Sequence, residues 1–221
     1  QSHNLPLSAI HLDIDCQVGN RAFTIDPDRF PNLASFTQEL RELGVEFIAI
    51  LNPGIKYSRN SNLFLEGQIL DGFCKLPNDK LVIAPVWPGW SVFPDFTNPK
   101  VRRWWSRQYQ YLLDVGVAGF WHDMNEPAAF ITSGDRSLPK VTQHYMEGRG
   151  GDHREAHNVY GLLQAEAAYE SLCQYSADRR PFIVSRAGWA GLQRYAWTWT
   201  GDVECTWPAL RTTMATVVGL G

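Results

Sequence analysis

The sequence predicts an α/β fold built around a parallel β-sheet. Short apolar runs alternate with longer segments of helical spacing, and continuous apolar runs are typical of strands that helices cover on both faces. The 221 residues suit a single domain, because α/β barrels extend to roughly 250 residues. Polar residues follow the apolar runs at one end, which is the edge where parallel sheets form their sites.

The first part of the chain supplies two strands, a helix and an irregular stretch. Residues 9–15 are an apolar run that ends in two aspartates and are predicted as a strand. Residues 30–43 have helical spacing and stop at a glycine, which favours a helix C-terminus. Residues 46–52 form a continuous apolar strand closed by Pro-Gly. Residues 58–79 have no strong period and are predicted as an excursion, followed by a strand candidate at 80–86.

The remaining elements continue the alternation. Residues 98–113 are helical, with a proline in the first turn, and 117–123 form an apolar strand. Residues 127–151 are rich in turn residues and are predicted as a long loop, whereas 157–175 have strong helical spacing. Two strands and a final helix complete the chain, at 181–186, 195–201 and 207–220.

The composition is that of a globular protein and excludes several functions. Hydrophobic residues make up 44% and charged residues 19%, so a chain kept disordered by its charge is excluded. The formal net charge of -3 argues against a nucleic-acid partner, which needs a basic excess. No apolar run approaches the ~20 residues that span a bilayer, so we expect no membrane partner.

The cysteines and the N-terminal residues predict the compartment. The four cysteines are far apart and form no CxxC pair, so neither a zinc site nor a small disulfide scaffold is indicated. Scattered cysteines are typical of buried thiols in a reducing compartment. The N-terminal segment has no basic region followed by an apolar core, as a signal peptide would have. We therefore expect a cytoplasmic protein, with its native N-terminus missing from this chain.

Polar residues end five successive predicted strands. Asp13 and Asp15 end the first, Asn52 the second, Asp123 the third, and Arg186 and Asp202 follow the last two. One such residue would be unremarkable, because strand ends meet water. Five in succession at the carboxyl ends of parallel strands predict a catalytic edge.

Two segments carry carboxylates that suit glycoside hydrolysis. In GFWHDMNEP, residues 119–127, a strand is followed at once by Asp123, and in WTWTGDVECTW, residues 197–207, a glycine turn presents Asp202. A pair of carboxylates is the minimum equipment for cleaving a glycosidic bond. Five of the nine Trp residues lie between positions 87 and 121 and four between 189 and 207, and flat aromatic rings stack on the apolar faces of sugars. The alternative for any single Trp is core packing.

Matching stretches along almost the whole chain resemble the catalytic barrel of glycoside hydrolase family 31, the α-glucosidase and α-xylosidase family. They are HLDIDCQVGNRAFTIDPDRFP, ILNPGIK, VWPGWSVFPDFTNPKVRRWW, FWHDMNEP, HNVYGLLQAEA, RPFIVSRAGWAG and WTWTGD. The resemblance implies an incomplete (β/α)8 TIM barrel. Residues 1–221 would be a partial catalytic domain, truncated at both ends, with barrel strands two to six and an excursion after strand three that holds 80–86.

The resemblance also implies a role for particular residues. Asp123 matches the nucleophile that forms a glycosyl-enzyme ester, and Asp202 matches the general acid/base. Asp13 matches a residue that binds a distal hydroxyl of the non-reducing sugar, and Arg186 one that binds a hydroxyl beside the nucleophile. The remaining matches line the sugar pocket, and they are Ile14, Ile55, Trp87, Met124 and Trp199. We also expect Trp197, Trp199 and Trp207 to surround Asp202 with apolar rings.

Three departures from the family pattern loosen the substrate assignment. Cys16 and Gln17 stand where Tyr-Met is common, Asn52 stands where Asp is common before Pro-Gly-Ile, and Val203 follows the acid/base where Asn is frequent. None of them replaces a catalytic carboxylate.

These matches predict a retaining α-glycosidase that hydrolyses terminal α-linked glucose from oligosaccharides or α-glucosides through a covalent glycosyl-enzyme. Its partner would be an oligosaccharide or glycoside substrate, and the oligomeric state stays open. The alternatives are an α-xylosidase or an α-glucosyl-transferring enzyme of the same family, a lyase acting through the same ester, or a non-catalytic sugar-binding fragment. The presence of both Asp123 and Asp202 favours an enzyme, although we expect this fragment alone to be inactive.

The sequence predicts no metal and no cofactor. His122 and Asp123 alternate along a strand and should point to opposite sides, so both cannot bind one ion. His144 and His157 are predicted as loop and helix residues rather than ligands. Two simpler roles remain open at this stage. Asp123 could cap the following turn, and Arg186 could be a surface ion-pair partner.

Overall fold

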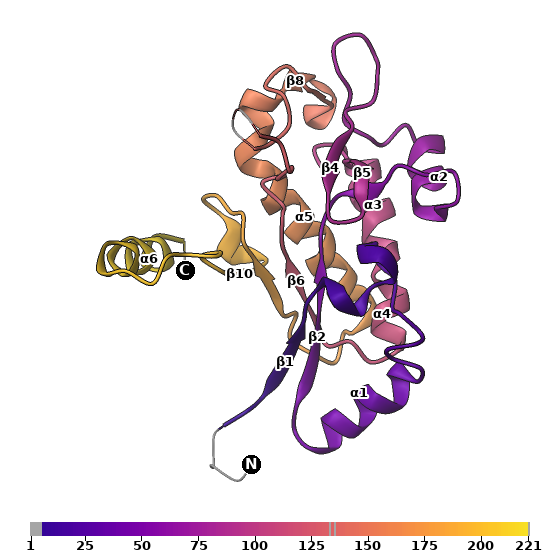
Figure 1. Ribbon diagram of the computed structural model, residues 1–221, viewed down its shortest axis with the longest axis vertical. Coiled ribbons are helices and arrows are strands. Elements are labelled where there is room, and N and C mark those ends of the chain that lie inside the picture. The colour runs from indigo at the N-terminus through magenta and orange to yellow at the C-terminus, as the bar shows by residue number, and fades with distance from the viewer. Residues whose placement is uncertain (1–5, 133, 135, 221) are drawn as a thin grey trace.

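The computed structural model describes residues 6–132, 134 and 136–220, and its centre is a sheet of five parallel strands. The strand order follows the chain: β1 (Ala9–Leu12), β2 (Glu46–Leu51), β6 (Gly119–His122), β9 (Ile183–Ser185) and β10 (Trp197–Thr198). Figure 1 shows these strands as an open row that does not close on itself. Strand order that repeats sequence order is the arrangement of a TIM barrel. The predicted parallel α/β fold and its incomplete barrel are therefore confirmed.

The register of the strands brings their carboxyl ends to one edge. Leu51 of β2 pairs with His122 of β6, which pairs with Ser185 of β9. The residues that come next, Asn52, Asp123 and Arg186, therefore share that edge. Trp197 of β10 pairs with Val184, so Trp199 and the turn beyond it follow at the same end.

Helices cover one face of the sheet. They are α1 (Leu33–Glu42), α3 (Pro99–Gln108), α4 (Gln110–Asp114) and α5 (His153–Tyr175), and they lie on one side of the row of strands in Figure 1. Phe47, Ala49 and Leu51 of β2 join the core beneath them, as period-two alternation requires. Trp105 and Tyr109 are fully buried there. Each such side chain contributes about 1.5–3 kcal/mol when buried.

A strand and a helix begin or end at residues other than those predicted, because of local hydrogen bonds. The strand predicted at 9–15 ends at Leu12, because the Asp13 carboxylate accepts from the Ile14 N–H and starts the short 3-10 helix η1 (Ile14–Cys16). The helix predicted at 157–175 starts earlier, at His153, because the Asp152 carboxylate accepts from the Arg154 N–H and caps it.

The elements on either side of the centre also differ in detail. The predicted helix 98–113 divides into α3 and α4 at Tyr109. The strand predicted at 195–201 is extended only at Trp197–Thr198, where β10 has a neighbour on one side alone within the described chain.

The excursion forms a separate small sheet. Strands β3 (Ile55–Lys56), β5 (Gly89–Val92) and β4 (Ala84–Val86) pair antiparallel in that order. The strand candidate at 80–86 is therefore confirmed only at its end and lies outside the barrel sheet, as expected. The stretch 58–79 is not wholly irregular, because Ser61 caps a helix, α2 (Asn62–Ile69), whose Phe64 stacks on Phe73.

The predicted loop 127–151 holds a short antiparallel pair and one turn of 3-10 helix. Strands β7 (Gln143–His144) and β8 (Gly151–Asp152) pair with each other, with η3 (Met146–Gly148) between them. The last helix, α6 (Trp207–Leu220), has no buried residue and stands apart from the other helices in Figure 1. Among the described helices, none is both long and apolar enough to cross a membrane.

We expect the 221 residues expressed alone to self-associate and to be inactive. Strands β1 and β10 end the described sheet, and α6 exposes Trp207 and Val218 at 84% each. Unpaired strand edges and exposed apolar side chains promote association. Size-exclusion chromatography with light scattering should give oligomers or aggregate, and a monomer that melts cooperatively would contradict this expectation.

Candidate active site

Asp123 is a buried, ion-paired carboxylate at the carboxyl edge of the sheet. It follows β6 directly, is 9% exposed, and places Oδ1 2.8 Å from Nη1 of Arg186. Burial raises the pKa of the Asp123 carboxyl, and the charge of Arg186 opposes that rise. Glu126 and Asp13 add like charge and raise it further. Arg186 therefore favours the ionised form of a partly desolvated carboxylate.

Arg186 joins Asp123 to a second carboxylate. Its Nε lies 2.8 Å from Oε1 of Glu126 and its Nη2 3.0 Å from Oε2, which is a bidentate pair, while Nη1 binds Asp123. Burial lowers the pKa of the guanidinium, but Glu126, Asp123 and Asp202 outweigh burial and raise it. Arg186 is thus an ion-pair partner inside the site and not only on the surface.

The turn after Asp123 is fixed to the neighbouring strand. Asn125 is fully buried, donates from Nδ2 to the Ser185 hydroxyl at 2.8 Å, and accepts at Oδ1 from the Ala187 N–H at 3.0 Å. Met124 adopts a positive φ of 56°, which is uncommon for a residue other than glycine and concentrates at functional sites. The Ala128 N–H donates to the Met124 carbonyl at 2.9 Å, so the backbone closes the turn and Asp123 is not needed as its cap.

Asp202 reaches the same edge through a glycine turn. Gly201 has a φ of 75°, and a Cβ built there would lie 3.2 Å from Cδ of Arg186, so the backbone passes close to the arginine stem. Asp202 follows it and is exposed. Its charge contributes to the raised pKa of Arg186, which places it within electrostatic reach of the pair.

The expected ring of tryptophans around Asp202 is wrong. Trp197 is 57% exposed and Trp207 84% exposed, because Trp207 begins α6, whose residues are not buried against the described sheet. Trp199 alone packs inward, with its ring edge-on to Trp121 at a centroid distance of 5.1 Å.

The other predicted pocket residues fall into two groups. Asp13 and Ile14 follow β1 at the catalytic edge, and the charge of Asp13 reaches Asp123. Ile55 is 2% exposed and lines a cavity of about 450 Å³ near Lys56 and Leu63. Trp87, at the β4–β5 turn, is 47% exposed and packs edge-on against Phe130 at 4.9 Å. The excursion therefore carries Ile55 and Trp87, whereas the barrel strands carry the charged residues.

His122 and Asp123 point to opposite sides of the sheet, as alternation predicts. His122 faces the helices, where its Nε2 lies 2.9 Å from the Tyr109 hydroxyl, and burial lowers its pKa to about 3. Asp123 faces Arg186 on the other side. The two residues therefore do not share an ion.

Sequence reasoning missed two residues of the site. Glu126 is the main partner of Arg186, and its signal was its place three residues after Asp123 in one short segment. Ser185 holds Asn125 and then donates to the Ala187 carbonyl at 2.7 Å. No local pattern marks Ser185, because its role depends on which strand lies beside β6.

A row of parallel β/α strands with an arginine-paired aspartate and a second aspartate at its carboxyl edge defines a TIM-barrel domain of the glycosidase type. The whole chain, residues 1–221, matches the family described as the glycosyl hydrolases family 31 TIM-barrel domain. The chain belongs to that family, which confirms the resemblance seen in the sequence.

The chain is similar to part of several longer proteins. It is 40% identical over 218 residues to alpha-glucosidase 2 of Bacillus thermoamyloliquefaciens, covering 99% of this chain and 27% of that protein. It is 36% identical to human neutral alpha-glucosidase AB, covering 99% of this chain and 23% of that one. A DNJ-bound structure of the glucosidase II alpha subunit superposes with a TM-score of 0.86 at 31% identity, covering 95% of this chain and 23% of that one. The chain thus spans about a quarter of these proteins.

Replacing Arg186 should move the acidic limb of the pH–rate profile to higher pH. In Arg186→Gln the opposing charge is lost, so the pKa of Asp123 rises further and a carboxylate nucleophile is protonated at a higher pH. We expect kcat/KM for an aryl α-glucoside near pH 7 to fall roughly ten- to hundredfold through loss of the ion pair, at ~1.4 kcal/mol for each tenfold change.

The measurement is a kcat/KM profile against pH for the full-length protein that contains these residues. Arg154→Gln, which removes an exposed arginine paired with Asp152, is the matched control and should leave the profile unchanged. An acidic limb that stays in place in Arg186→Gln would contradict the assignment.

Proposed function

We propose that the protein carrying this chain is a retaining α-glycosidase that hydrolyses terminal α-linked glucose from oligosaccharides or α-glucosides. The observation that carries the proposal is the buried Asp123 carboxylate held against Arg186, with the Asp202 carboxylate exposed at the same edge. One carboxylate is fixed and partly desolvated, as a nucleophile requires. The other reaches solvent, as proton exchange with a leaving group and with water requires.

The proposed reaction has two steps. Asp123 attacks the anomeric carbon and forms an ester while Asp202 gives its proton to the departing glycosidic oxygen. Asp202, now ionised, takes a proton from water, and the resulting hydroxide cleaves the ester, so that Asp123 is released as a carboxylate and Asp202 is protonated again. Arg186 stabilises the ionised form of Asp123 before the first step and after the second.

In this proposal, the residues around Asp123 and Asp202 bind the substrate. Asp13 would accept from a sugar hydroxyl, and Met124, which is 7% exposed beside Arg186, would support the ring from below. Trp87, Trp199, Ile14 and Ile55 would supply apolar walls, although the cavity that Ile55 lines includes none of the carboxylates of the catalytic edge. Asn52 is 5% exposed, and its buried amide has no hydrogen-bond partner within the described residues. The relatives named alpha-glucosidase support glucose as the sugar.

A panel of nitrophenyl α-glycosides tests the proposal on the full-length protein. We expect α-glucoside to be hydrolysed fastest, with α-xyloside and α-galactoside well behind. Faster cleavage of α-xyloside would favour the α-xylosidase alternative, and transfer to an added sugar in preference to water would favour the transferring enzyme. Sugar binding without turnover would point to a non-catalytic module and would overturn the proposal.

Removing the charge of Asp13 should weaken sugar binding, whereas removing that of Asp123 should prevent formation of the ester. Asp13→Asn weakens one charged hydrogen bond to the sugar, so we expect kcat/KM to fall about ten- to hundredfold while the glycosyl-enzyme still forms. Asp123→Asn removes the nucleophile, and no ester should form. Intact-protein mass spectrometry after reaction with a fluorinated glucosyl fluoride measures the ester directly.

Asp15→Asn is the matched control, since Asp15 lies in the same turn and, among the described residues, its carboxylate has one ion pair, with exposed Arg29 at 3.6 Å. It should behave as the wild type does. Labelling of Asp123→Asn, or the loss of labelling in Asp13→Asn, would contradict the roles assigned to these residues.

We also propose a cytoplasmic location, which the free state of all four cysteines supports. Fractionation of the source cells tests it, and recovery of the protein from a secretory compartment or the medium would contradict it.

A further inference from the structure

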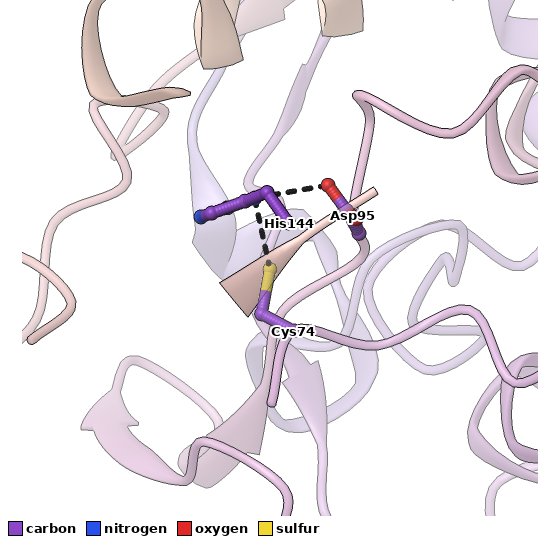
Figure 2. A group of neighbouring side chains, drawn as sticks. All are labelled: Cys74, Asp95 and His144. Atoms are coloured by element: carbon purple, nitrogen blue, oxygen red, sulfur yellow. Dashed lines mark hydrogen bonds and ion pairs between the residues drawn. The ribbon is translucent and has the colours of Figure 1, made fainter. Parts of the chain in front are cut away.

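A second group of ionisable side chains lies buried away from Asp123 and takes no part in the proposed reaction. Figure 2 shows Cys74, from the segment after α2, beside Asp95, which follows β5, and His144 of β7. Nδ1 of His144 lies 2.9 Å from Oδ1 of Asp95 and 3.9 Å from Sγ of Cys74. All three residues are buried, with 7% exposure at most.

Hydrogen bonds continue from this cluster toward the loop that bears the nucleophile. Nε2 of His144 lies 3.0 Å from Nδ1 of His153, and Nε2 of His153 lies 3.2 Å from the Ser137 hydroxyl. Ser137 donates to the Pro127 carbonyl at 2.7 Å. The path therefore runs from Asp95 to the carbonyl of Pro127, the residue after Glu126, whose carboxylate holds Arg186.

The acceptors and donors allow one consistent placement of the protons. Asp95 accepts from the Thr97 N–H and hydroxyl at Oδ1 and from the Tyr145 N–H at Oδ2. Burial raises the pKa of Asp95, but the hydrogen bonds and the charge of His144 outweigh burial and lower it. Asp95 is therefore an ionised acceptor, and His144 carries a proton on Nδ1 that it donates to Oδ1.

The hydrogen bonds of Ser137 determine which nitrogen of His153 carries its proton. Ser137 gives its one hydroxyl proton to the Pro127 carbonyl, so it accepts from Nε2 of His153, whose bare Nδ1 accepts from Nε2 of His144. His144 therefore donates from both ring nitrogens, to Asp95 and to His153, and is the charged ring beside the Asp95 carboxylate. Nδ1 of His157 lies 3.3 Å from Nε2 of His153 and 3.4 Å from the Ser137 hydroxyl. Burial, with help from the charges of His144 and His157 and against that of Asp152, lowers the pKa of His153 to about 3, so the ring stays neutral. A charged His144 ring and a neutral His153 ring thus join Asp95 to Ser137.

A divalent cation at Cys74, Asp95 and His144 is the alternative, since their donor atoms lie within 4.8 Å of one another. Both oxygens of Asp95 already accept hydrogen bonds, and Nδ1 of His144 carries a proton directed at one of them. Burial also raises the pKa of the Cys74 thiol, and the charge of Asp95 adds to that rise, so the thiolate that binds metals is disfavoured. The hydrogen-bond network accounts for the cluster without an ion.

We propose that Asp95, His144, His153 and Ser137 are positioning residues that hold the Pro127 carbonyl, and through it Glu126 and Arg186, in the arrangement that presents Asp123. The proposal rests on the proposed glycosidase function. Its geometric part is independent of that function, because Ser137 contacts the Pro127 carbonyl whatever reaction Asp123 performs.

Ser137→Ala removes the last hydrogen bond of the path and leaves the core untouched. In the full-length protein we expect kcat to fall about tenfold with KM within about twofold. The segment after Asp123 is then no longer fixed by the hydrogen bond to the Pro127 carbonyl, whereas the residues that contact the sugar are unchanged. Ser137→Thr keeps the hydroxyl and should restore kcat. Ser137→Ala combined with His153→Asn should lose little more than the larger single effect, since both lie on one path.

Thr142→Val is the matched control. Thr142 lies in the same loop, is fully buried, and has a hydroxyl with no partner in the described part of the chain. Hydrogen exchange of the amides of residues 123–129, followed by mass spectrometry, gives a readout that needs no turnover. We expect faster exchange there in Ser137→Ala and no change in Thr142→Val.

The outcomes separate the two proposals. Faster exchange in a protein that cleaves no glycoside would support the network and contradict the glycosidase. Unchanged exchange in Ser137→Ala, or a lower melting temperature with kcat intact, would overturn the network. Metal analysis of the purified protein tests the metal-site alternative. A stoichiometric divalent ion that is lost in Cys74→Ser would show a metal site at this cluster and would contradict the hydrogen-bond network.

Discussion

The ion pairs of Arg186 are the interaction on which the site depends. A guanidinium out of full contact with water costs several kcal/mol unless it is paired, and Arg186 meets this cost with two carboxylates at once. Glu126 holds two of its nitrogens and so fixes the plane of the fork, and Nη1 lies 2.8 Å from the Asp123 carboxylate as an ion pair. The like charges of Asp123 and Glu126 can share one small region only because Arg186 lies between them.

The register of the sheet places these charged groups beside one another. His122 pairs with Ser185, so the next residues, Asp123 and Arg186, emerge side by side from neighbouring strands. The close packing of α5 supports the two turns, because a Cβ at Gly161 would lie 2.9 Å from the Asn125 carbonyl oxygen and 2.9 Å from the Ala187 Cβ. Gly201 then lets the following strand end pass over the arginine stem. Small residues are required at both positions because backbone or side-chain stem occupies the space.

Much of this architecture is predictable from the sequence, and the limits have physical causes. The five parallel strands follow from apolar runs of strand length, and the catalytic edge follows from the polar residues that end them. The matched motifs indicate Asp123, Asp202 and Arg186. The bidentate pairing of Glu126 and the path from Asp95 to Ser137 join residues that are far apart along the chain, and only the fold decides which of them meet. The ring of tryptophans around Asp202 was predicted from sequence proximity, yet exposed Trp207 shows that neighbours in sequence on a helix without a packed face do not enclose a site.

The measurement that tests the central claim most directly is the separation of the Asp123 and Asp202 carboxyl groups in a crystal structure of the full-length protein with a bound sugar analogue. If Arg186 and the Gly201 turn set these two groups on either side of one glycosidic bond for a retaining reaction, their separation should be ~5–5.5 Å. A separation of ~6.5–9.5 Å, which leaves room for a water molecule and belongs to inverting enzymes, would contradict the account.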